Sequence, residues 1–127
     1  MFNVTASQAQ VRLPNERRRR RELTDTISGL ESSRRLLQQA FERASQRKQT
    51  FFSQNLKMNR EDWRGQTAER FHSNDIESIT HFANDYLTRL ERAITTISRA
   101  ISTSNTSLTS INQTIVNLER IIAKGGI

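Results

Sequence analysis

The strongest constraint on the fold is a run of apolar residues that recurs at steps of three and four between Ile79 and Ile122. The pattern persists for about six heptads, which is the period of a long amphipathic helix and not the alternation of a β-strand. The sequence therefore predicts one helix over residues 66–123. The stripe comprises Ile79, Phe82, Tyr86, Leu90, Ala93, Ile97, Ala100, Ser104, Leu108, Ile111, Ile115, Leu118 and Ile122.

A second heptad pattern lies in the first half of the chain and predicts a helix over residues 14–53. Pro14 suits the first turn of that helix, because a proline at this position gives up no intrahelical hydrogen bond. Residues 1–13 lack helical spacing and are expected to form a loose arm. The stripe of this helix comprises Leu23, Ile27, Leu30, Leu37, Phe41, Ala44 and Phe51.

The stretch 54–65 interrupts both stripes and contains asparagines and Gly65, the residue types that turns prefer. We therefore expect the chain to reverse here, giving a single all-α domain: a long antiparallel helical hairpin, or two-helix coiled coil, ending in a tail at 124–127. No apolar run is long enough to cross a membrane, and residues 1–10 do not read as a signal peptide. A cytoplasmic location is expected.

The expected helices differ in length, about 57 Å for the first and about 85 Å for the second. Folding the chain back would leave the stretch around 108–122 beyond the first helix, and exposed apolar surface usually marks an interface. This predicts packing into a helical bundle with a partner, with a hetero-oligomer favoured over a homodimer. The predicted interface comprises Ile94, Ile97, Ile101, Leu108, Ile111, Ile115 and Leu118.

One short motif stands at the expected bend: Trp63, Gly65, Ala68 and Phe71, in the arrangement W-x-G-x-x-A-x-x-F. Gly65 permits a tight turn, and Trp63 can cover the end of a two-helix core. The motif between two amphipathic helices resembles the WXG-motif (ESAT-like) family of small helical-hairpin proteins of type VII secretion. The chain is most similar to the YwqH-like members, which accompany LXG toxins.

The resemblance implies a non-enzymatic targeting or chaperone-like adaptor that binds the helical N-terminal domain of an LXG-type toxin and promotes its export, and that is itself a candidate for co-secretion. In that family an aromatic residue followed four residues later by an acid near the end of the second helix often serves export. Here the C-terminus lacks such a pair. Phe71 and Asp75 have the spacing but lie at the start of the second helix.

The formal charge of +7 comes from the first 65 residues, which hold fourteen Lys and Arg against seven Asp and Glu. The densest block is Arg17, Arg18, Arg19, Arg20 and Arg21. Five consecutive helical residues point in all directions and no aromatic residues interleave, so a solvated run or pairing with an acidic partner is favoured. A small nucleic-acid-binding protein is the alternative, since arginines also bind phosphates.

Catalysis has little support in the sequence, and neither a cofactor nor a metal is expected. There is no cysteine, and His72 and His81 would lie on opposite sides of one helix. No glycine-rich phosphate loop is present, and a two-helix hairpin offers no deep cleft. A toxin-neutralising protein remains a third hypothesis.

Overall fold

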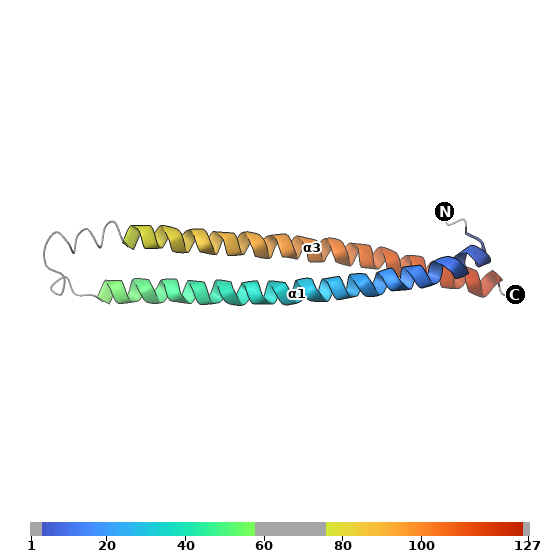
Figure 1. Ribbon diagram of the computed structural model, residues 1–127, viewed down its shortest axis with the longest axis horizontal. Helices are drawn as coiled ribbons and strands as arrows, with labels where there is room; N and C mark the ends of the chain where they lie inside the picture. Colours follow the sequence, from blue (N-terminus) through green and yellow to red (C-terminus); the bar gives the residue numbers. More distant parts are fainter. Residues whose placement is uncertain (1–3, 58–75, 126–127) are drawn as a thin grey trace. The chain divides into compact units, whose positions relative to one another are not determined.

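The computed structural model describes residues 4–57 and 76–125, with side-chain environments for 4–53 and 76–125. These residues form two long helices, α1 (Ala6–Lys57) and α3 (Ile76–Gly125), and no strand occurs among them. Figure 1 shows the two helices running side by side in opposite directions. The predicted all-α helical hairpin is thereby confirmed.

The chain divides into two compact units, each made from a stretch of α1 and a stretch of α3. The terminal unit comprises residues 1–33 and 97–127, and the central unit comprises residues 34–96. In the terminal unit, Arg17 reaches Glu119 while Arg20, three residues later, reaches Asn112. A later residue of α1 therefore contacts an earlier residue of α3, so the two helices pair antiparallel.

The prediction of a loose arm before residue 14 is wrong, because α1 begins at Ala6. Thr5 is its N-cap: the Gln8 backbone N–H donates to Thr5 Oγ1 at 3.2 Å, and the Thr5 N–H donates to Gln8 Oε1 at 3.1 Å. This reciprocal pair is a capping box. Val4 before the cap and Ala9 after it belong to one apolar cluster, as in a hydrophobic staple.

Pro14 therefore lies inside α1. An internal proline removes one backbone hydrogen bond and costs about 3 kcal/mol, and it commonly bends a helix. The blue N-terminal part of α1 does bend in Figure 1. The cost is offset because the extension buries Ala9 and Leu13 against Ile115 and Leu118 of α3.

The expected length mismatch does not appear among the described residues, where α1 has 52 residues and α3 has 50. Helix α1 continues to Lys57, four residues beyond its predicted end, and α3 ends at Gly125 instead of residue 123. The remainder of the predicted turn, residues 58–65, and the predicted start of the second helix, residues 66–75, lie outside the described residues. The start of α1 also lies close to the end of α3: a Cβ at Gly125 would clash with the Cβ of Ala6.

The polar stretch 102–114 remains helical although it is rich in Ser, Thr and Asn, which are poor helix formers. Three of its four threonine hydroxyls bond within the helix: Thr106, Thr109 and Thr114 each donate to the carbonyl four residues earlier, at 3.0–3.1 Å. These three hydroxyl groups are therefore satisfied locally. The apolar residues of this stretch remain free to pack on α1.

Candidate partner-binding surface

Several residues of the predicted interface belong to the chain's own core. Ile115 and Leu118 are almost fully buried with Ala9 and Leu13, and Ile101 is buried as well. The premise that the far end of the second helix lacks cover is wrong, because residues 4–13 cover it. Ile101, Ile115 and Leu118 are therefore core residues. The remaining four, Ile94, Ile97, Leu108 and Ile111, are half-buried, and their contact with a partner stays a prediction.

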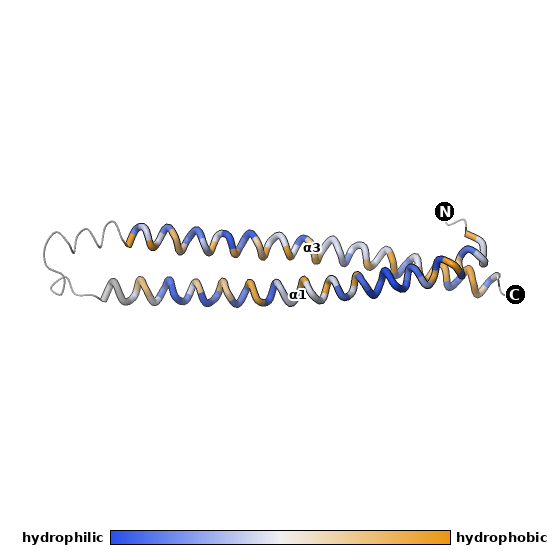
Figure 2. Tube along the Cα trace, in the orientation of Figure 1, coloured by the Kyte–Doolittle hydropathy of each residue, from blue (hydrophilic) through white to orange (hydrophobic). Residues whose placement is uncertain are grey.

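The arginine block lies in the terminal unit, in the blue hydrophilic stretch of α1 in Figure 2. Two of its members bond across to α3: Arg17 pairs with Glu119 at 3.4 Å, and Arg20 donates to Asn112 at 3.5 Å. Arg18 donates to Asn15, and Arg19 pairs with Glu16. Four of the five arginines therefore have partners within the chain.

Arg21, the remaining member of the block, borders a shallow hollow of about 290 Å³ in the terminal unit. Arg20 and Asp25 also line this hollow, together with Asn112 of α3. The hollow is open, and its charges are of both signs. Two arginines and one aspartate line it, so this hollow by itself does not mark an anion site.

In the central unit, α3 carries a broader apolar face than one neighbouring helix can cover. Its inward side includes Ala83, Leu87 and Leu90, of which Leu90 is buried. Ile79, Phe82 and Tyr86 form a second stripe, which at 100° per residue is centred about 70° around the helix from the first. Their exposed fractions are 42%, 77% and 48%.

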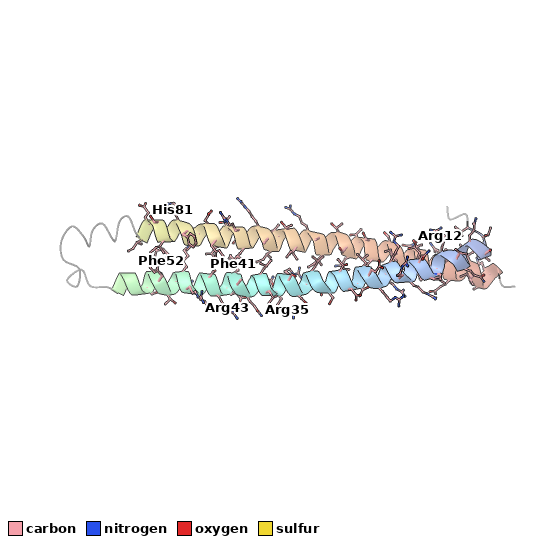
Figure 3. The ribbon with its side chains drawn as sticks, in the orientation of Figure 1. Arg12, Arg35, Phe41, Arg43, Phe52 and His81 are labelled. Carbon is pink, nitrogen blue, oxygen red and sulfur yellow. The ribbon has the colours of Figure 1, made fainter. Side chains whose placement is uncertain are left out.

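The single stripe expected from the sequence is therefore divided: Leu90 is buried, whereas Ile79, Phe82 and Tyr86 are exposed. The rotation of α3 places Thr80 and Ala83 toward α1 instead, and both are half-buried. Phe41 and Phe52 lie on the side of α1 toward α3, whereas His81 lies on the outer side of α3 (Figure 3). A two-helix seam is narrow, so the second stripe remains at the surface.

The second stripe forms one bank of a groove of about 450 Å³, which lies entirely within the central unit. The groove exists because small side chains meet where larger ones would fill the space: Ala40 and Ala44 on α1, and Ala83 on α3. An apolar concavity with a few polar groups at its edge is typical of a binding site. Its lining is completed by Arg43, Arg47, Lys48, Phe51, Ile79, Phe82 and Tyr86.

The opposite bank is basic. Arg43 and Arg47, one helical turn apart on α1, line the groove and also a second hollow of about 360 Å³ on the outer side of that helix. Neither arginine forms an ion pair with another described residue. Lys48 differs, because it donates to Asn84 Oδ1 and its Nζ lies 5.9 Å from the centre of the Phe52 ring.

The motif residues Trp63, Gly65, Ala68 and Phe71 lie outside the described residues, as do Asp75 and His72. Their predicted roles stay predictions. Within 4–57 and 76–125, no group of three or more His, Asp or Glu side chains is placed to hold a metal ion. Neither described helix contains an apolar stretch of the length needed to span a bilayer.

Sequence reasoning missed the groove, although its residues were visible in the pattern. Ile79, Phe82 and Tyr86 have helical spacing, but so do Ala83, Leu87 and Leu90, and a signal was present in this doubling of apolar positions.

Comparison of the chain with protein-family models, with curated proteins and with solved structures returned no match. The likeness to the WXG-motif family thus rests on the motif and on the hairpin architecture.

Proposed function

We propose that the chain is a non-enzymatic adaptor of a type VII secretion system that binds the helical N-terminal domain of an LXG-type toxin and promotes its export. The observation that carries the proposal is the second apolar stripe of α3, Ile79, Phe82 and Tyr86, which the chain leaves exposed. A helix in a two-helix hairpin needs one apolar stripe to pack on its partner helix. A second apolar stripe is covered only if another molecule packs against it.

Two further observations support binding to a helical partner. The groove beside the stripe is apolar and elongated along the helices, which suits the helix-in-groove mode of recognition. The W-x-G-x-x-A-x-x-F motif supplies the link to type VII secretion, since it resembles the motif of proteins that pair with toxin helices. In this proposal the adaptor meets its toxin in the cytoplasm, before export.

The nucleic-acid alternative is less favoured. It depends on Arg17–Arg21 as one basic surface, yet five consecutive helical residues point in all directions, and Arg17 and Arg20 turn toward α3. Ionic strength separates the two functions, because nucleic-acid binding falls steeply with added salt while burial of apolar surface does not.

The test is deletion of the gene from a host that encodes an LXG-type toxin beside it, followed by measurement of toxin in the culture medium and inside the cells. The adaptor function predicts that secreted toxin falls while growth is unaffected, and that the full-length chain restores secretion. Unchanged secretion would contradict the proposal. Growth arrest upon deletion would instead support a toxin-neutralising protein.

A further inference from the structure

We infer that the groove of the central unit is the docking site for one amphipathic helix of a partner protein, a helix whose apolar stripe is bordered on one side by acidic residues. The inference rests on the proposed function and names the chemistry of the partner. It depends on the two sides of the groove. The aromatic bank on α3 is the second stripe, Ile79, Phe82 and Tyr86, and the basic bank on α1 comprises Arg43 and Arg47.

The dimensions of the groove suit a short stretch of helix. On α3 the bank runs from Ile79 to Tyr86, about 10 Å at 1.5 Å per residue, and on α1 the lining runs from Ala40 to Phe51, about 16 Å. A helix laid along it would engage the groove over roughly two to three turns. Two or three large apolar side chains at i, i+3 or i+4, and i+7 would then fill the space above Ala44 and Ala83.

The charge of the α1 bank selects for an acidic flank. Between Arg34 and Ser53, α1 carries five basic residues and one acid, Glu42. Arg43 and Arg47 lie at the edge of the groove and have no ion partner among the described residues. The aromatic bank does not select for acids in this way, because beyond it Asp85 and Arg89 already pair with each other at 3.5 Å. The acids of the partner should therefore border its stripe on the side that faces α1.

A second copy of this chain fits the groove less well than such a partner. The chain has a formal charge of +7, so self-association would work against repulsion. The stretch of α1 beside the groove is itself strongly basic, and juxtaposed like charges oppose pairing. An acidic partner helix removes this repulsion and pairs the two arginines.

The inference can be tested with three designed helical peptides of about 18 residues, roughly five turns. The first has an apolar stripe with glutamates along one side, the second has lysines at the same positions, and the third has the composition of the first in an order without a stripe. Binding to the full-length chain is measured by fluorescence anisotropy at physiological salt. The acidic amphipathic peptide should bind at least about tenfold more tightly than either of the others.

Two variants locate the site. Phe82→Ser should weaken binding of the acidic peptide by about tenfold or more, and Arg43→Glu combined with Arg47→Glu should reverse the preference toward the lysine peptide. Leu36→Ser and Arg35→Glu are matched controls, because both residues are exposed on α1 of the same unit and neither lines the groove. The controls should bind like the unmodified chain.

Several results would overturn the inference: equal binding of all three peptides, no binding of any, loss of binding in the control variants alone, or a dimer of the free chain that Phe82→Ser converts to a monomer. Failure here is distinguishable from failure of the proposed function. If a toxin domain binds the Phe82→Ser chain with unchanged affinity, the docking site alone is refuted. If the acidic peptide binds tightly but deletion of the gene leaves toxin export unaltered, the secretion role alone is refuted.

Discussion

Thr5 and Gln8 close the first turn of α1 by bonding to each other: each donates its backbone N–H to the side-chain oxygen of the other, at 3.1 and 3.2 Å. Four residues after Thr5, Ala9 is fully buried with Leu13, Ile115 and Leu118. The cap thus stabilises the turns of α1 that cover the last turns of α3.

Replacing Thr5 should therefore weaken the terminal unit. We expect Thr5→Ala to lower the free energy of unfolding by about 1 kcal/mol, because the amide of Gln8 loses its side-chain acceptor. Thr5→Ser retains the hydroxyl and should stay close to the unmodified chain. Urea denaturation followed by circular dichroism measures both. Equal stability of the Ala and Ser variants would contradict the capping role.

The core of the terminal unit can be probed at Leu118, whose exposed fraction is 0%. Leu118→Ala should cost roughly 2 to 5 kcal/mol, through lost burial and the cavity left behind. Val116 is the matched control, since it lies on the same helix with an exposed fraction of 51%. Val116→Ala should change the unfolding free energy little. A similar loss for the two variants would mean that Leu118 is not covered by α1.

The two described glycines of α1 and α3 should respond oppositely to alanine. A Cβ at Gly29 meets nothing within 4 Å. Gly29→Ala should thus stabilise the helix by about 0.5 to 1 kcal/mol, because alanine restricts the unfolded chain and favours helix. Gly125→Ala should destabilise, since its Cβ would clash with Ala6. Thermal unfolding gives the sign of each effect, and a lower melting temperature for Gly29→Ala would refute the open environment.

The ion pair between Arg17 and Glu119 should contribute little, although it joins the two helices. Both side chains are half exposed, and exposed pairs are screened by solvent and salt. A double-mutant cycle with Arg17→Ala and Glu119→Ala should give a coupling free energy of about 0.5 kcal/mol that declines with added salt. Coupling above roughly 2 kcal/mol would indicate a buried network instead.

Much of the fold followed from periodicity. The heptad patterns predicted two helices and a hairpin, because apolar residues spaced by three and four can only be buried together on a helix. The start of α1 was missed because Pro14 resembled a first-turn residue, although Thr5 and Gln8 have the spacing of a capping box. The proline was outweighed by the burial that Ala9 and Leu13 gain on α3.

The binding surface was harder to predict because it depends on the rotation of α3. Both Ile79, Phe82, Tyr86 and the inward set around Ala83 and Leu87 have helical spacing. Which set faces α1 depends on how the side chains of the two helices fit together, for example at the small Ala44. That fit is a property of packing between distant segments, and no local pattern in the sequence records it.

Tyr86 permits the most direct test of the central claim, that the exposed stripe of α3 contacts a helical partner. It is the only tyrosine of the chain, so incorporation of 3-fluorotyrosine gives a single ¹⁹F resonance at the edge of the groove. Adding the unlabelled helical domain of an LXG-type toxin should shift and broaden this resonance as a complex forms, with light scattering reporting the complex independently. A complex that leaves the resonance unchanged, or a mixture in which no complex forms, would contradict the account.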